Sequence, residues 1–208
     1  MAAALYRVSL RMAIQPGKEK EFEEAWLTGA ARIADAPGNV GQELSQGEGD
    51  GAYYVVSDWE SKEAFAAYEC SPGHQEHRRS LAPYRTRGEM VTMRTLYRMD
   101  AEGRARKKSS VRVLLHLRVA SGQEDRVENL YHRVSDELDG TPGLLRNELL
   151  QGLAAPQEWA VLSEWRDADA FREWENGADH RGTTAPLRPF QNQEAGSVFG
   201  VYEVRAEH

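Results

Sequence analysis

Two histidines at equivalent positions are the side chains best suited to move a proton. His74 follows a Ser-Pro-Gly segment at 71–73, and His180 occupies the same place later in the chain. An imidazole titrates near neutral pH, which makes it the first choice for a general base. His77 lies one helical turn beyond His74, but Thr183 stands at its counterpart. The alternative, a surface histidine on a capped turn, is the commoner arrangement for such a segment.

Aromatic side chains form a second duplicated set. Trp59 and Trp165 each end a predicted strand, and a period of two places Tyr53 on the same face as Trp59. We expect both tryptophans to border a cavity beside the helices, although a tryptophan at this place is more often part of a core. The residues predicted to bind substrate there are Tyr53, Phe65, Tyr68, Tyr84, Arg85, Phe171 and Trp174.

An internal repeat explains why these residues come in pairs. Gly122 follows Gly17 by 105 residues (122 − 17), and Trp165 follows Trp59 by 106 (165 − 59). The one-residue shift falls in a Gly-rich or Pro-containing segment that suits a hairpin tip. The sequence therefore predicts two domains, residues 1–99 and 111–208, joined by a polar linker at 100–110.

Each copy alternates the periods of strand and helix. An apolar residue at every second position predicts a first strand, and spacings of three and four then predict a helix. A hairpin follows, then a second helix capped by Ser61 or Asp167, which the Ser-Pro-Gly segment interrupts in the first copy. A closing strand is predicted at 90–97 and 197–204. The order βαββαβ is ferredoxin-like and belongs to the α+β class.

The sheet face opposite the helices would be left bare in a single copy. The second copy is the nearest available cover, so we expect the halves to lie sheet against sheet as an intramolecular pseudo-dimeric α+β barrel. Arg7 and Arg112 point to that buried face, and Glu43 and Glu148 are their expected partners. An anionic ligand between the halves is the alternative partner.

Composition narrows the classes of function. A net charge of −7 disfavours nucleic acid, and no apolar run reaches the roughly 20 residues that span a bilayer. Cys70 is the single cysteine, and no zinc-type spacing of Cys and His occurs. We expect a cytoplasmic protein that binds neither metal, membrane nor nucleic acid.

The motifs resemble those of the antibiotic biosynthesis monooxygenase family. The resemblance lies in Val-Ser-Asp-Trp at 56–59, Ala64-Phe65 and the Ser-Pro-Gly-His segment at 71–74, and it returns at 161–165, Ala170-Phe171 and His180. It implies dimeric α+β barrels and a cofactor-independent monooxygenase that oxidises a phenol or anthrone of aromatic polyketide-type metabolism to a quinone with O2. The implied ligands are a small aromatic substrate and O2, with no cofactor, and the fused pair could assemble further into a homo-oligomer.

Within that resemblance His74, His180, Trp59 and Trp165 are the expected catalytic residues. The family pattern has an Asn four residues before the Trp, but Val55 and Val161 stand there. The alternatives are therefore an aromatic polyketide cyclase, in which a histidine moves protons without O2, and a non-catalytic ligand-binding barrel. If one cavity works alone, the first copy has more acid and base groups, His77 among them.

Overall fold

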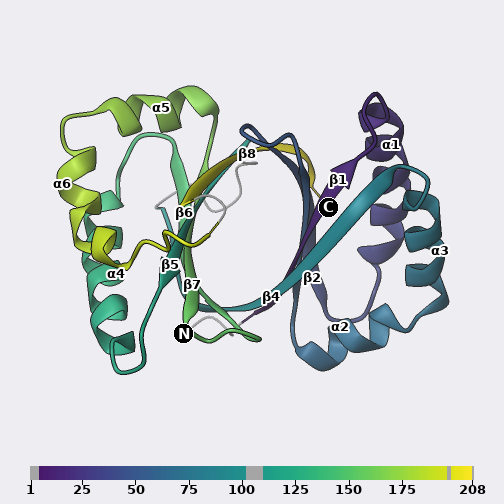
Figure 1. Ribbon diagram of the computed structural model, residues 1–208, viewed down its shortest axis with the longest axis horizontal. Helices are drawn as coiled ribbons and strands as arrows, with labels where there is room; N and C mark the ends of the chain where they lie inside the picture. The colour runs from purple at the N-terminus through teal and green to yellow at the C-terminus, as the bar shows by residue number, and fades with distance from the viewer. Residues whose placement is uncertain (1–4, 102–109, 196–197, 208) are drawn as a thin grey trace. The chain divides into compact units, whose positions relative to one another are not determined.

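The chain alternates strands and helices in two similar series. The computed structural model describes residues 5–101, 110–195 and 198–207, so most of the predicted linker lies outside the described residues. The first series is β1 (Tyr6–Ile14), α1 (Glu19–Ile33), β2 (Asn39–Gly47), β3 (Tyr53–Trp59), α2 (Lys62–Glu69), α3 (Pro72–Leu81) and β4 (Arg85–Asp100). The second is β5 (Val111–Arg118), α4 (Glu124–Leu138), β6 (Leu144–Gly152), β7 (Glu158–Trp165), α5 (Ala168–Asn176), α6 (His180–Thr184), the 3-10 helix η1 (Ala185–Phe190) and β8 (Phe199–Glu207) (Figure 1).

The predicted α+β fold of two ferredoxin-like repeats is confirmed. The strands follow the hydrogen-bonded order β1-β3-β2-β8-β5-β7-β6-β4, which closes into a barrel. We expected one independent sheet in each half, yet β4 and β8 continue from one half of this order into the other. β4 has 16 residues, whereas its neighbour β1 has 9.

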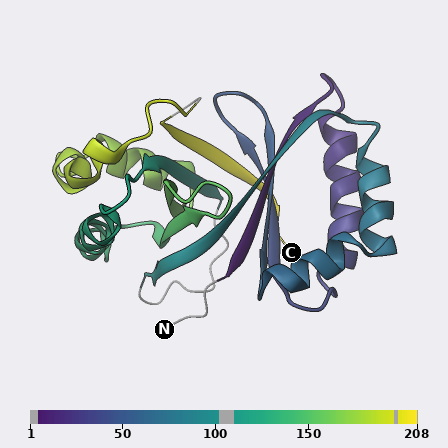
Figure 2. The ribbon, with the colours of Figure 1, turned by 60° about the horizontal axis from the view of Figure 1, so that its bottom comes forward.

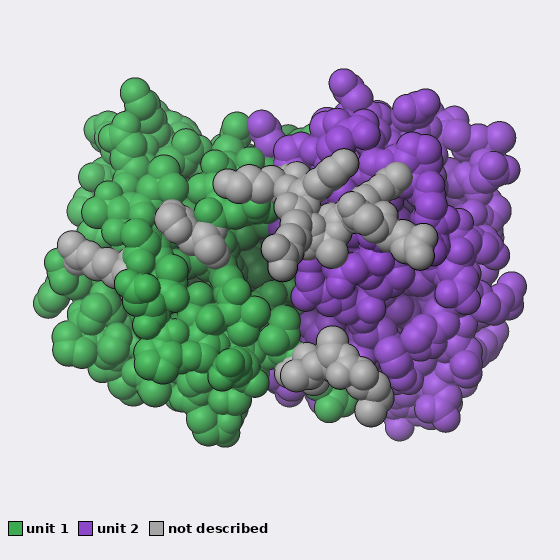
Figure 3. Space-filling model, turned by 180° about the vertical axis from the view of Figure 1, so that it is seen from behind, with its two compact units in different colours: residues 1–94, 204–208 green, residues 95–203 purple. Residues whose placement is uncertain are grey.

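The chain folds into two compact units, coloured separately in Figure 3. Unit 1 comprises residues 1–94 and 204–208, and unit 2 comprises residues 95–203. The long strands β4 and β8 therefore each contribute residues to both units. The domain limits at 99 and 111 mark the sequence repeat and stay a prediction.

In unit 1, β1 lies between β3 and β4 and is antiparallel to both. Leu10 is opposite Val55 on one side and Met90 on the other. Helices α1, α2 and α3 lie together on one face of these strands, with α1 and α3 side by side (Figures 1 and 2). The side chains of Phe22, Trp26 and Ala30 are fully buried on the inner face of α1, as their spacing predicts.

In unit 2, β5 lies between β7 and β8, and the inner faces of α4 and α5 contribute to one continuous core. Both predicted caps are confirmed, because Ser61 Oγ accepts from Ala64 N at 3.1 Å and Asp167 Oδ1 accepts from Ala170 N at 2.8 Å. No helix among the described residues combines the length and apolarity needed to cross a membrane.

The Ser-Pro-Gly segment does more than interrupt a helix. Ser71 caps α3 and Pro72 is its first residue, so His74 lies in the first turn of a ten-residue helix. The counterpart in unit 2 is five residues of α6 followed by η1, which contains Pro189. A proline in the first turn starts a helix, whereas one further along interrupts the ladder of backbone hydrogen bonds.

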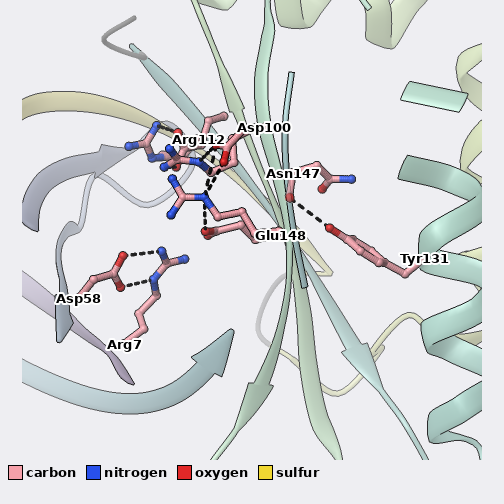
Figure 4. Close-up of polar contacts among 10 residues, drawn as sticks. Arg7, Asp58, Asp100, Arg112, Tyr131, Asn147 and Glu148 are labelled. Carbon is pink, nitrogen blue, oxygen red and sulfur yellow. Dashed lines mark hydrogen bonds and ion pairs between the residues drawn. The ribbon is translucent and has the colours of Figure 1, made fainter. Parts of the chain in front are cut away.

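The arginines of the first strands each contact a carboxylate on a neighbouring strand. Arg7 contacts Asp58 at 2.7 Å, and Arg112 contacts Glu164 at 3.2 Å (Figure 4). These carboxylates lie directly opposite the arginines on the neighbouring strands, where cross-strand pairs of opposite charge are favourable. Glu148 is fully buried and lies 3.9 Å from Arg98. Its expected pairing with Arg112, like that of Glu43 with Arg7, stays a prediction. Near it, the Tyr131 hydroxyl donates to the carbonyl oxygen of Asn147 at 3.0 Å.

Candidate active site

Unit 1 contains a cavity of about 560 Å³ between its strands and its three helices. This volume is typical of sites that bind a drug-sized molecule. We call it the helix-side cavity. Its lining residues are Val8, Leu10, Met12, Trp26, Ile33, Gln42, Val55, Ser57, Trp59, Phe65, Tyr68, Glu69, His74, His77, Arg78, Leu81, Ala82, Arg85, Thr86, Arg87, Gly88 and Met90.

The β1 side of the cavity follows from strand geometry. Val8, Leu10 and Met12 face it because alternate side chains of a strand share one face. Met90, opposite Leu10 on β4, is 53% exposed and stands at the mouth. An apolar interior with an exposed edge suits a flat aromatic molecule that enters from solvent.

Aromatic rings form one wall of the helix-side cavity. The ring of Tyr68 stacks on that of Trp59, with centroids 5.0 Å apart and planes at 27°. Phe65 meets Trp59 edge-on at 5.7 Å. The indole is held in place because Trp59 Nε1 donates to Ser57 Oγ at 2.9 Å. Offset and edge-on contacts of this kind stabilise aromatic clusters and provide a flat surface for another ring.

His74 stands at the end of this wall. Its imidazole meets the Tyr68 ring edge-on at 4.9 Å, and its backbone N–H donates to the capping Ser71 Oγ at 3.1 Å. Its Nδ1 is buried and has no hydrogen-bond partner among the described residues. Burial lowers the pKa of His74, and the positive charges of Arg78 and Arg85 lower it further, against the opposing effect of Glu69. The imidazole is therefore neutral at pH 7 and able to accept a proton.

Positive charge borders the same end of the cavity. Arg78, Arg85 and Arg87 line it, and Arg87 pairs with Glu89. Arg78 and Arg85 form no ion pair with another described residue. An unpaired guanidinium beside a cavity can bind a phenolate or carboxylate of a ligand.

The structure brings together five of the predicted residues in unit 1, namely Trp59, Phe65, Tyr68, His74 and Arg85. Tyr53 and Tyr84 are absent from the lining. Tyr53 is buried in the core, where its hydroxyl donates to Glu23 Oε1 at 2.6 Å. Burial raises the pKa of Tyr53, and the contact with Glu23 raises it further. Tyr84 is half-buried between α3 and β4.

Several lining residues were not predicted from the sequence. Gln42 is buried on β2, and its Nε2 donates to the carbonyl oxygen of Ala30 at 2.6 Å. Gly88 and Met90 enter from β4, opposite β1. These residues could be found only from the register between β4 and β1. That register depends on both strands and cannot be predicted from either segment alone.

Unit 2 repeats the aromatic cluster, but the side chains around it differ from those of unit 1. Trp174 lies 5.2 Å from Trp165 and 4.4 Å from the His180 ring, and Phe171 lies 5.6 Å from Trp165. His180 Nδ1 is also buried without a partner among the described residues, and burial lowers its pKa. The positions of Arg78, Arg85 and Arg87 are taken by Thr184, Gln191 and Gln193 in the repeat.

The part of the chain that the structure describes has no group of three His, Cys, Asp or Glu side chains arranged for a metal ion. The polar and ionisable side chains that line the helix-side cavity include imidazoles, guanidinium groups, hydroxyls and the carboxylate of Glu69.

Comparison with known sequences decides the family. The model of the antibiotic biosynthesis monooxygenase family matches residues 5–80 and again residues 110–185. The chain belongs to the antibiotic biosynthesis monooxygenase family. The two matches make it a tandem member, with one family domain in each repeat.

Two curated proteins are similar over part of their length. Protein SchA of Streptomyces halstedii is 33% identical over 99 residues, which is 48% of this chain and 26% of that protein. The 42.8 kDa protein in the whiE locus of Streptomyces coelicolor is 37% identical over 79 residues, 38% of this chain and 20% of that protein. The chain thus aligns with about a quarter of the length of these relatives.

Solved structures share the fold of this chain at low identity. The FN1347 protein of Fusobacterium nucleatum has a TM-score of 0.79 at 12% identity, and the match covers 100% of this chain and 95% of that one. An anthrone oxidase-like protein has a TM-score of 0.69 at 14% identity, with 99% and 93% covered. At these identities the likeness concerns the fold.

Proposed function

We propose that the protein is a cofactor-independent monooxygenase that oxidises a phenol or anthrone to a quinone with O2 in the helix-side cavity. The observation that carries the proposal is the pairing of the aromatic wall with His74, whose buried Nδ1 has no partner among the described residues. Family membership and the anthrone oxidase-like structural neighbour support the class of reaction.

The reaction begins with a proton transfer in this proposal. His74 removes a proton from the anthrone or phenol, and the resulting anion is electron-rich enough to give an electron to O2. Recombination forms a carbon–oxygen bond, and loss of water leaves a carbonyl. For an anthrone, the CH2 carbon becomes C=O, one oxygen atom of O2 enters the product and the other leaves as water.

The cavity has suitable groups for each part of the substrate. Trp59 and Tyr68 offer flat surfaces to the ring system, and Arg85 offers positive charge to the developing oxyanion. Val55 lines the cavity and supplies no hydrogen bond, so the polar contacts come from other lining residues. Trp165 and His180 form the corresponding cluster of unit 2, for which we propose the weaker site because Thr184 and Gln191 stand at the positions of Arg78 and Arg85.

Oxygen uptake with an anthrone tests the proposal. The expected stoichiometry is one O2 consumed for each quinone formed. A general base usually contributes more than tenfold to the rate, so His74→Ala should lower kcat at least about tenfold. The melting temperature should stay nearly the same. Gln75→Ala is the matched control, since Gln75 is exposed on α3 beside His74 and does not line the cavity.

The possible outcomes separate the candidate functions. Equal activity of the His74→Ala protein would remove this residue from the mechanism. Turnover of a polyketide-like substrate without O2 consumption would favour the cyclase, in which the same imidazole starts an aldol-type condensation. Ligand binding without any turnover would favour a non-catalytic binding protein.

A further inference from the structure

A glycine stands on the cavity-facing side of β4. Gly88 lies opposite Met12 of β1, just as Met90 lies opposite Leu10. All four of these residues line the helix-side cavity. Residues directly opposite each other on antiparallel strands point to the same face of the sheet, so a side chain at position 88 would project into the cavity.

The backbone does not require glycine at this position. Gly88 is not among the described residues whose φ is positive. The register shift between β1 and β4 falls at Ala13 and Ile14, beyond the pair of Met12 and Gly88. Glycine inside a strand weakens it, because the residue has no side chain to pack. Neither a turn nor a bulge therefore accounts for Gly88.

Packing does not require glycine here either. A Cβ atom placed on Gly88 would lie 3.7 Å from Leu10 Cδ1 and 3.9 Å from the carbonyl oxygen of Arg11, which are ordinary van der Waals distances. At Gly38, by contrast, the added Cβ would lie 2.6 Å from that of Ala64. Gly88 is also exposed, so the space beside it is open and belongs to the cavity.

In unit 2 a residue with a side chain pairs with the corresponding position of the first strand. Leu117 is the counterpart of Met12, and the residue opposite Leu117 is Gln191. Glycine is thus no general requirement of the repeat. A glycine within a strand often marks a place where a ligand approaches the backbone closely.

The lining residues of β1 give the length of the cavity. Val8, Leu10 and Met12 span four steps along the strand (12 − 8), or about 13 Å at the usual rise per residue. A system of three fused aromatic rings has about this length. Gly88 lies at the Met12 end, so the last ring of a ligand that fills the cavity would lie against it.

We propose that Gly88 is a specificity-determining residue, whose missing side chain leaves room for the outer ring of a substrate with three fused rings. This inference rests on the proposed function and adds the position that separates fused-ring substrates from smaller phenols. A side chain at position 88 would shorten the cavity from the β4 side. Shorter ligands would still bind against Trp59 and Tyr68 at the other end of the aromatic wall.

Gly88→Ala and Gly88→Val test the inference, because they add carbon atoms on the cavity face of β4. The ligands are 1,8-dihydroxyanthraquinone, with three fused rings, and 8-hydroxy-1-tetralone, which keeps a hydroxyl beside a carbonyl on two rings. Titration calorimetry gives both affinities. One methylene group in an apolar pocket changes recognition roughly tenfold or more, so Gly88→Val should weaken anthraquinone binding at least about tenfold and Gly88→Ala by less. Binding of the tetralone should hardly change.

The melting temperature distinguishes a cavity role from a structural one. It should stay the same or rise in both variants, because valine and alanine have side chains to pack and the nearest atoms lie at ordinary contact distances. Val91→Leu is the matched control, since Val91 is 49% exposed on β4, opposite Ser9, and does not line the cavity. This control should leave both affinities unchanged.

Unchanged anthraquinone affinity in both Gly88 variants would overturn the inference. Equal losses for the two ligands would overturn it too, because they would indicate a general disturbance of the cavity. If Gly88→Val does not fold, Gly88→Ala decides the question, since its loss should still be larger for the anthraquinone than for the tetralone.

Binding also separates this inference from the proposed oxidation. If the unaltered protein binds the anthraquinone but consumes no O2 with anthrone, the oxygenase proposal fails, while the affinities of the Gly88 variants still decide the role of this residue. If the unaltered protein binds the tetralone but not the anthraquinone, the cavity does not admit a third ring and the inference is wrong. Binding of neither ligand would contradict both proposals.

Discussion

His74 shows how the surroundings of one residue set its chemistry. A histidine on a turn in water would titrate near its ordinary pKa and find hydrogen bonds with solvent. Here the ring is half-buried against Tyr68 at a centroid distance of 4.9 Å, with two arginines nearby. Both influences favour the neutral form, which is the form that accepts a proton.

The pH dependence of kcat/KM follows from this shift. The pKa of His74 lies below its ordinary value of 6.5, so activity should persist through neutral pH and fall only as pH drops through the lowered pKa. The acid limb of the profile should therefore have a midpoint below 6.5. A limb centred above that value, or one retained in His74→Ala, would point to a different base.

Arg85 offers a second test at the same scale. Arg85→Gln introduces the residue found at the equivalent place in unit 2, Gln191, and removes one positive charge from the cavity. A partly screened charge contributes about 1 kcal/mol, so KM for an anionic aromatic ligand should rise about fivefold. The melting temperature should hardly change, because Arg85 forms no ion pair with another described residue. Arg79→Gln, on the exposed side of α3, is the control, and an equal rise in KM there would contradict the assignment.

Among the elements, α3 matters most because it carries both histidines of the helix-side cavity. Its first turn depends on Ser71, which accepts the His74 backbone N–H, and on Pro72, whose missing N–H costs nothing at this position. In unit 2 the corresponding segment is the five-residue helix α6, which is followed by the 3-10 helix η1. The two repeats thus differ chiefly in the helix that presents the imidazoles.

Loss of the α3 cap should affect stability and catalysis together. Ser71→Ala removes the acceptor at 3.1 Å and should cost about 1 kcal/mol, or a fall of about 2–4 °C in melting temperature. Fraying of the first turn also displaces His74, so kcat should fall. Asp167→Ala removes the N-cap of α5, a helix without His74, and should lower the melting temperature by a similar amount while leaving kcat intact. Equal losses of kcat in both variants would show that general stability, and not the position of His74, is responsible.

Across the whole molecule the duplication has produced two unequal units. Both contain a Trp–aromatic–His cluster with similar ring spacings. In unit 1, Arg78 and Arg85 line the cavity, and the His77 ring packs against Gly29. Unit 2 has neutral side chains at the positions equivalent to these arginines, and Val134 at the position of Gly29. The two repeats share their core residues and therefore their fold. Their polar residues at the cavity positions differ, so the second repeat need not have the same binding site.

The asymmetry predicts one strong ligand site per chain. Titration calorimetry with 1,8-dihydroxyanthraquinone should give a stoichiometry near one, because Arg78 and Arg85 line the cavity of unit 1 and a guanidinium group suits a phenolate. His74→Ala combined with Arg85→Gln should abolish most of this binding. Two equivalent sites, or a site unaffected by these substitutions, would contradict the assignment to unit 1.

The sequence alone determined the duplication, the order of elements and the α+β class. Helix and strand periods are local properties, and the spacing of Trp59 from Trp165 repeats them in each copy. The helix caps at Ser61 and Asp167 were predictable for the same reason, since a cap depends on residues three apart. The aromatic wall and His74 were also predicted, because neighbours on one strand face or in one helix turn follow from the sequence.

Only the tertiary structure decided which of those side chains meet. Tyr53 lies on the predicted face but is buried in the core, where its hydroxyl donates to Glu23, and Arg7 pairs with Asp58 on the neighbouring strand. Gly29 and His77 are 48 residues apart (77 − 29), and nothing in either segment indicates that the His77 ring packs against Gly29. Such contacts depend on the packing of α1 against α3 and on the register between strands, and these are set by side chains distant in the chain.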